Sequence, residues 1–257
     1  MTDTHTHLYL PEFYEDIDSI MSECINMGIN CLILPNVDLE SIPQVKLLHH
    51  KYPQVTHVAM GLHPTEVKEN WEEVLDVMKE ELENGEYVAV GEIGMDLYWD
   101  TSTLEIQKKA FEEQLKLAEK HQLPVIIHSR NACDETLEVI RKVKPTVPLI
   151  FHSFTAGVED VRKIREIADA YFGINGVVTY KNAQSLRDAL PEIGIERILL
   201  ETDAPWLSPV PHRGKRNDST KVIHVKDKIA EVLGLPSETV ERITDQNAIK
   251  AFPTINK

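Results

Sequence analysis

The sequence contains little cysteine and no long hydrophobic run, and both absences restrict what the protein can be. Its three cysteines, Cys24, Cys31 and Cys133, show no C-x-x-C spacing, so we expect reduced thiols and no disulfide. No apolar run approaches the roughly 18 residues that a membrane helix needs. The first ten residues have neither the basic nor the apolar region of a signal peptide. These features predict a cytoplasmic protein without a membrane partner.

Positive charge is also scarce. The 257 residues contain 27 Lys and Arg against 42 Asp and Glu, so the formal net charge is −15. Such a surface repels nucleic acid at long range, which argues against a protein that coats duplex DNA. An enzyme that holds one phosphate with metal ions and a local basic loop stays compatible with this charge. The hydrophobic fraction of 42% is ordinary for a globular protein and argues against a disordered chain.

Eight short apolar runs alternate with longer amphipathic segments along the chain. Successive runs are about 32 residues apart, the size of one βα unit, and continuous apolar strands are typical of a parallel sheet covered by helices. No G-x-G-x-x-G follows the first run, so a dinucleotide-binding fold is not indicated. The pattern predicts an α/β protein, a (β/α)8 TIM barrel with an extra C-terminal helix, as a single domain over 1–257. The expected strands lie in 1–7, 30–37, 55–63, 87–94, 124–129, 148–154, 170–176 and 197–204, and the last helix in 237–251.

Nearly every expected strand ends in a residue that can bind a metal ion or a phosphate. In a βα barrel these ends open onto one face, so residues that are distant in sequence should converge there. His5 and His7 alternate with Thr6, and two imidazoles that point the same way form half of a divalent-ion site. Each candidate alone has a plainer explanation, such as a hydrogen-bonded core histidine or a helix-capping carboxylate, but their number favours ligation. The other candidates at strand ends are His63, Glu92, His128, His152 and Asp203.

A carboxylate directly after an apolar strand is costly to bury unless it is paired or ligated, and this is the position of Glu92. Its two oxygens can bridge two cations, so we predict a two-metal site. A nitrogen-rich ligand set suits zinc, manganese or cobalt better than calcium. The predicted ligands are His5, His7, Glu92 and Asp203 around one ion, and Glu92, His128 and His152 around the other.

We predict that this site performs hydrolysis, with Glu92 and Asp203 as the catalytic residues. Asp203 would hold the attacking water and accept its proton. His63 and Arg130 are predicted to contact substrate, Arg130 through a bidentate hydrogen bond to a phosphate. A place in a surface loop would explain either residue as well. The basic segment 212–216 can clamp a polyanion over the site, or it can be a solvated loop.

Several motifs of the chain resemble the TatD family of metal-dependent deoxyribonucleases, within the amidohydrolase-like barrels. The resemblance implies a TIM-barrel phosphodiesterase with two divalent metal ions (Mg²⁺, Mn²⁺ or Zn²⁺). It implies a DNA exonuclease working from the 3′ end, with DNA as a transient partner and no obligate protein partner. By motif it makes the same six residues metal ligands and places His63 on the substrate side. The matching segments are DTHTHL at 3–8, GLHP at 61–64, GEIGMD at 91–96, IHSRNA at 127–132, HSF at 152–154, GVVTYKNA at 176–183, LLETDAPWLSPVPHRGKRN at 199–217 and QNAIKAF at 246–252.

Two segments depart from the family pattern and leave the substrate preference open. Residues 153–156 read Ser-Phe-Thr-Ala where the family commonly has Cys-Phe-Ser-Gly, and residues 217–219 read Asn-Asp-Ser in place of Asn-Glu-Pro. One alternative is a metal-dependent amidohydrolase acting on a small amide, lactone or aminoacyl ester. Glu92, in the place where related barrels often use a carboxylated lysine, favours the nuclease-like branch. A catalytically idle scaffold would predict a missing ligand, and none is missing.

Overall fold

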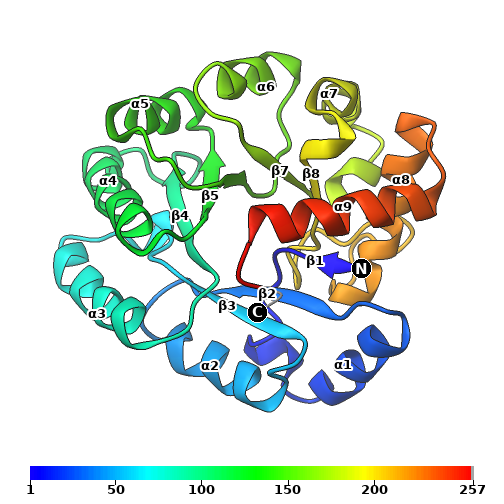
Figure 1. Cartoon of the computed structure of the whole chain (residues 1–257), viewed down its shortest axis with the longest axis horizontal. Coiled ribbons are helices and arrows are strands. Elements are labelled where there is room, and N and C mark those ends of the chain that lie inside the picture. The colour runs from blue at the N-terminus through cyan, green and yellow to red at the C-terminus, as the bar shows by residue number, and fades with distance from the viewer. Residues whose placement is uncertain (256–257) are drawn as a thin grey trace.

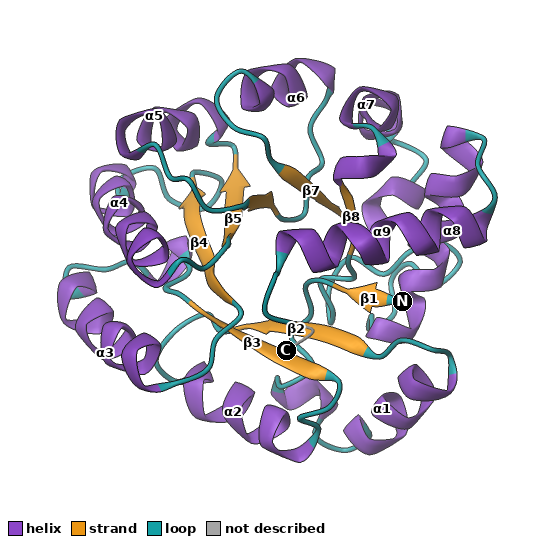
Figure 2. Cartoon of the chain, in the orientation of Figure 1, coloured by secondary structure: helices purple, strands orange, loops and turns teal. Residues whose placement is uncertain are grey.

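The computed structural model describes residues 1–255 and contains one sheet of eight strands, ordered β1 to β8. Each strand pairs in parallel with the next one along the chain. Figure 1 shows the helices α1 to α8 as an outer ring, and Figure 2 shows the strands enclosed by that ring. This nearly closed barrel confirms the predicted TIM-barrel fold.

The elements alternate as the apolar rhythm predicted. The strands are β1 (Thr2–Asp3), β2 (Cys31–Pro35), β3 (Thr56–Met60), β4 (Ala89–Asp96), β5 (Val125–Arg130), β6 (Leu149–Phe151), β7 (Tyr171–Ile174) and β8 (Ile198–Leu200). The helices are α1 (Ile17–Asn26), α2 (Ser41–Lys51), α3 (Trp71–Asn84), α4 (Leu104–His121), α5 (Cys133–Val143), α6 (Val158–Arg165), α7 (Gln184–Ile193), α8 (Val222–Leu233) and α9 (Ser237–Ala251). No helix within residues 1–255 is long and apolar enough to cross a membrane.

The first strand is shorter than the sequence predicted. Only Thr2 and Asp3 pair with β2, so the expected strand over 1–7 is wrong beyond residue 3. Beyond residue 3 the segment bonds to both neighbouring strands, since Thr6 N–H donates to Ile33 O of β2 at 3.1 Å and Thr4 N–H donates to Leu200 O of β8 at 2.9 Å. Within β1, the Asp3 carboxylate accepts from the Thr202 backbone N–H at 3.0 Å and from its hydroxyl at 2.6 Å. Asp203 N–H then donates to His5 O at 2.9 Å. Backbone and side-chain hydrogen bonds that do not form a regular ladder therefore close the barrel at the seam between its first and last strands.

Helix α9 covers one end of the barrel, as Figure 1 shows in red. Its residues Ala248 and Ala251 and the following Phe252 are buried in a cluster with inward-facing side chains of the strands. Phe252 is fully buried. The strand residues in this cluster include Ile33, Ala59, Ala89, Ile126, Ile150 and Leu199. Because α9 seals this end of the barrel, the carboxyl ends of the strands form the other, open end.

Candidate metal centre

Seven residues that the sequence singled out meet at the carboxyl ends of the strands. All are buried except His63, His128 and Asp203, which are partly exposed. They come from the segment after β1, the loop after β3, the strands β4 and β5, and the loops after β6 and β8. The residues brought together are His5, His7, His63, Glu92, His128, His152 and Asp203.

Glu92 occupies the middle of this group. Strand β4 loses its regular register with β5 between Val90 and Ile93, and irregularities of this kind re-aim side chains next to functional sites. Oε2 of Glu92 lies 3.1 Å from His5 Nε2, whereas Oε1 lies 2.7 Å from His128 Nδ1. The two oxygens of one carboxylate therefore face two different sets of histidines.

The first set gathers around Glu92 Oε2. His5 Nε2 and His7 Nε2 are 3.1 Å apart, and Asp203 Oδ1 lies 3.9 Å and 3.7 Å from them. Ligands held at 2.0–2.2 Å from one ion stand about 3–3.5 Å from each other. The distances of His5 Nε2 from His7 Nε2 and from Glu92 Oε2, both 3.1 Å, fall in this range, and Asp203 Oδ1 lies somewhat farther out. The group of His5, His7 and Glu92 is therefore suited to hold a divalent cation.

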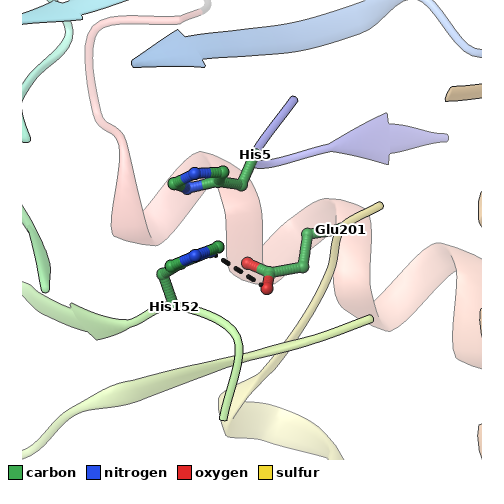
Figure 3. Close-up of side chains that lie close together, drawn as sticks. All are labelled: His5, His152 and Glu201. Atoms are coloured by element: carbon green, nitrogen blue, oxygen red, sulfur yellow. Dashed lines mark ion pairs between the residues drawn. The ribbon is translucent and has the colours of Figure 1, made fainter. Parts of the chain in front are cut away.

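The second set gathers around Glu92 Oε1. His63 Nε2 and His152 Nε2 lie 3.3 Å and 3.5 Å from this oxygen, and His63 Nε2 lies 3.3 Å from His128 Nδ1. His152 also stacks on His5, with ring centroids 3.5 Å apart, and Figure 3 shows the two rings face to face. His152 thus packs against the first set while its Nε2 faces the second.

Hydrogen bonds fix which nitrogen of His7 carries the proton. The Tyr9 hydroxyl donates to Pro35 O at 2.7 Å, so its contact of 2.8 Å with His7 Nδ1 is one that the imidazole donates. The lone pair of a singly protonated His7 then lies on Nε2, which faces the site. Neutral imidazoles with an oriented second nitrogen are the usual ligands of transition metals.

Buried carboxylates orient two more imidazoles. Asp96 Oδ2 lies 2.9 Å from His128 Nε2, which directs the other nitrogen, Nδ1, toward Glu92. Glu201 Oε1 lies 3.2 Å from His152 Nδ1, as the dashed line in Figure 3 marks. Such outer carboxylates hold metal-binding histidines in place.

His63 differs from the other imidazoles. It precedes a short 3-10 helix at Pro64–Glu66, and its Nδ1 accepts the Thr65 N–H at 3.2 Å. A neutral His63 therefore carries its proton on Nε2, the nitrogen that faces Glu92 and His128. This arrangement makes His63 a hydrogen-bond donor into the site, which suits contact with a substrate oxygen better than contact with a cation.

Burial and three carboxylates, those of Glu92, Glu201 and Asp203, determine the electrostatics of the centre. Burial lowers the pKa of His5. Burial would also lower the pKa of His152, but Glu201, Glu92 and Asp203 raise it to about 10. Burial opposes ionisation of Glu92, yet the surrounding histidines hold its pKa well below the usual range. Negative charge is thus enclosed by nitrogen donors, and this donor set fits one or two divalent cations.

Asp96 belongs to the centre although it was not among the predicted site residues. Asp96 is buried and lies on β4, two residues after Gly94. At Gly94 the strand packs so tightly on β5 that an added Cβ would lie 2.1 Å from His128 O. Strand alternation offered a signal, because Glu92, Gly94 and Asp96 share one face of β4. Tyr9 was missed for a different reason, since its link to His7 depends on a loop.

Replacing Asp96 by Asn should weaken binding of the divalent ion nearest His128 by about 10- to 100-fold, because the amide holds the imidazole less firmly. Titration of the metal-free protein with Mn²⁺ in a calorimeter measures this change. Asp100→Asn is the matched control, since Asp100 is an exposed aspartate of the following loop that caps Ser102. Equal affinities of the two variants would show that Asp96 does not orient a ligand.

Arg130 and the basic segment 212–216, which were both predicted as possible substrate contacts, have different surroundings. Arg130 is exposed, and its guanidinium carbon lies 3.8 Å above the Tyr98 ring. Arg216 forms an ion pair with Asp16 and packs over Phe13, so its positive charge is already paired within the protein. The segment 212–216 therefore offers less free positive charge than its sequence suggests.

Comparison with known proteins identifies the family of the chain. The family described as TatD related DNase matches residues 2–253. YabD of Bacillus subtilis, named as an uncharacterised metal-dependent hydrolase, is 33% identical over 251 residues, which are 97% of this chain and 98% of YabD. YcfH of Escherichia coli, with the same description, is 29% identical over 98% of this chain and 95% of its own length.

Solved structures show the same fold. The crystal structure of YjjV, a TatD homologue from Escherichia coli, superimposes with a TM-score of 0.92 at 28% identity, covering 99% of this chain and 98% of YjjV. A TatD family hydrolase from Entamoeba histolytica superimposes with a TM-score of 0.84 at 18% identity, covering 98% and 97% of the two chains. The match across almost the whole chain shows that this protein belongs to the TatD family of metal-dependent hydrolases.

Proposed function

We propose that this hydrolase is a phosphodiesterase with two divalent cations, and that its substrate is DNA, cleaved as a 3′ to 5′ exonuclease. The observation that carries the proposal is the position of Glu92, whose two oxygens face separate sets of histidines inside one buried pocket. A single carboxylate between two cations is the arrangement of two-metal phosphodiester hydrolysis. The family description, TatD related DNase, supports the same reaction class.

The residues divide into two groups of ligands. When bound, the two cations supply Lewis acidity that lowers the pKa of water and neutralises charge developing on the phosphodiester oxygens. Glu92 links the groups through its two oxygens. In our proposal the first group is His5, His7, Glu92 and Asp203, and the second is Glu92, His128 and His152.

Two residues then act on the reacting atoms. Asp203 Oδ1 lies 3.9 Å from both His5 Nε2 and His152 Nε2, and its side chain is 14% exposed, so it can reach both the ligands and solvent. Asp203 therefore orients the attacking water and accepts its proton. His63 donates from Nε2 to an oxygen of the phosphodiester. His7 and His128 turn one nitrogen outward to Tyr9 and Asp96, which leaves the other nitrogen of each ring facing the site.

The proposal is tested by release of labelled mononucleotide from single-stranded DNA. Purified protein with added Mn²⁺ or Mg²⁺ is expected to release mononucleotides, and a chelator should abolish the release because the ligand set then holds no cation. DNA labelled at the 5′ end should shorten stepwise if attack begins at the 3′ end. A protein that binds two metal ions but cleaves no oligonucleotide would contradict the proposal, and hydrolysis of a small amide or lactone by it would identify the other reaction class.

A further inference from the structure

Two large aromatic side chains are exposed next to the metal centre, in the loop after β4. Tyr98 is 53% exposed and Trp99 is 71% exposed, although they are adjacent. Leaving such rings in water forgoes the stabilisation that their burial would give. Neighbouring exposed aromatics therefore indicate a surface that is used for binding.

Arg130 joins these two rings in one surface. Its guanidinium carbon lies 3.8 Å above the Tyr98 ring and 5.6 Å from the Trp99 ring centre, and the two rings meet edge to face at 4.9 Å. Guanidinium groups stack on aromatic faces and still present N–H donors at their edge. We call Tyr98, Trp99 and Arg130 the stacking surface.

The stacking surface is built on the same strand ends as the second set of metal-centre residues. Tyr98 N–H donates to Asp96 Oδ1 at 2.9 Å, while the other oxygen of Asp96 binds His128. Arg130 follows His128 by two residues and is paired in register with Asp96. The stacking surface is therefore connected to the metal centre through Asp96 and His128.

The chemistry of the surface selects a class of substrate. Flat rings with one cation suit a nucleobase and its phosphate, because every base offers a π-face and Arg adds a cation–π contact. Inside a duplex both faces of a base are covered by neighbouring bases, so such a base must be unpaired and unstacked before it can rest between these side chains. A small amide or lactone has no face of this size.

Resting on the phosphodiesterase function above, we propose that Tyr98, Trp99 and Arg130 hold an unpaired nucleobase next to the scissile phosphodiester. The substrate is then single-stranded nucleic acid. Base stacking is independent of the sugar, so this surface serves DNA and RNA alike, and any preference between them arises at the metal centre.

The test pairs a change in the protein with a change in the substrate. Trp99→Ala should raise KM for a single-stranded oligonucleotide by about 5- to 100-fold and leave kcat within about 2-fold, because stacking contributes to binding and not to the chemical step. Trp99→Phe should recover most of the loss. With an oligonucleotide that is abasic at its two 3′-terminal positions, wild type and Trp99→Ala should have equal KM values.

Leu47→Ala is the matched control, since Leu47 on α2 is 71% exposed, as Trp99 is, and lies outside the stacking surface. Binding is measured separately by the anisotropy of a labelled phosphorothioate oligonucleotide with Mn²⁺, in single-stranded and duplex form. Single strands should bind more tightly than duplex, and Trp99→Ala should remove that difference. Leu47→Ala should change neither KM nor affinity.

The outcomes separate this inference from the proposed function. Metal-dependent cleavage that is equally efficient in wild type and Trp99→Ala would overturn the stacking surface and leave the phosphodiesterase in place; an aromatic patch for a protein partner would then be the better explanation. Trp99-dependent binding of single strands without any cleavage would support the surface and contradict the phosphodiesterase. Equal affinity for duplex and single strand would overturn the requirement for an unpaired base.

Discussion

Replacing Glu92 by Gln is expected to lower kcat/KM for metal-dependent phosphodiester hydrolysis by about 10³-fold or more, since two cations together contribute several kcal/mol of transition-state stabilisation. The amide keeps the size of the side chain but offers one oxygen in place of two. Whichever way it turns, either the His5 side or the His128 side of the site faces an NH₂ group that cannot bind a cation. Activity and bound metal should therefore fall together.

The measurement combines kinetics with metal analysis of the dialysed protein. We expect wild type to retain two divalent ions per chain and Glu92→Gln to retain at most one. Glu86→Gln is the control, because Glu86 is exposed and precedes the same strand at its opposite end. If Glu92→Gln kept full metal content with unchanged activity, Glu92 would not bridge the two sets of histidines.

Replacing Phe252 by Ala should lower the free energy of unfolding by about 3–5 kcal/mol, the range for removing a large buried aromatic side chain. Phe252 is fully buried after α9, and its ring packs in the cluster that fills the closed end of the barrel. The neighbours in that cluster belong to several different strands, so they cannot all move inward to fill the cavity. The loss is therefore expected near the upper part of this range.

Urea unfolding of the metal-free proteins measures this loss, because bound cations would add their own stabilisation to the folded state. Ile249→Ala is the matched control on the same helix, where the side chain is 45% exposed. It should change the free energy of unfolding by no more than about 0.5 kcal/mol. Similar losses in the two variants would show that α9 does not seal the barrel through Phe252.

The fold could be predicted from the sequence because the same pattern of apolar and amphipathic segments is repeated along the chain. Eight apolar runs, each followed by an amphipathic segment, allow an error in one element without changing the architecture. The error fell on the first strand, where Thr4 and Thr6 continue an alternating pattern that looks extended. There the backbone N–H groups of Thr4 and Thr6 bond to β8 and to β2 in turn, and the buried Asp3 carboxylate binds Thr202. Local pattern cannot reveal a partner at the far end of the chain.

The residues of the candidate site could be predicted where metal-ligating residue types occur at the ends of the expected strands. Glu92 and His128 come at the ends of apolar runs and Asp203 lies three residues beyond one, and barrel topology alone brings such positions together. The division of histidines into two sets around Glu92 needed the bulge in β4, which no residue pattern marked. Arg130 was predicted to hold a phosphate, but its stacking on Tyr98 depends on the path of a loop. Positions on loops are set by tertiary packing, which a sequence pattern does not encode.

The contact that closes the barrel also determines when, during synthesis of the chain, the metal centre can be completed. Asp3 and its partner Thr202 are 199 residues apart, and the histidine pair and Asp203 adjoin this contact. At about 5–20 residues per second, a ribosome needs about 10–40 s to add that length. During this interval His5 and His7 have left the ribosome without the aspartate that completes their set. Metal capture thus belongs to the last stage of biosynthesis, and a chain arrested before strand β8 is built carries an incomplete centre.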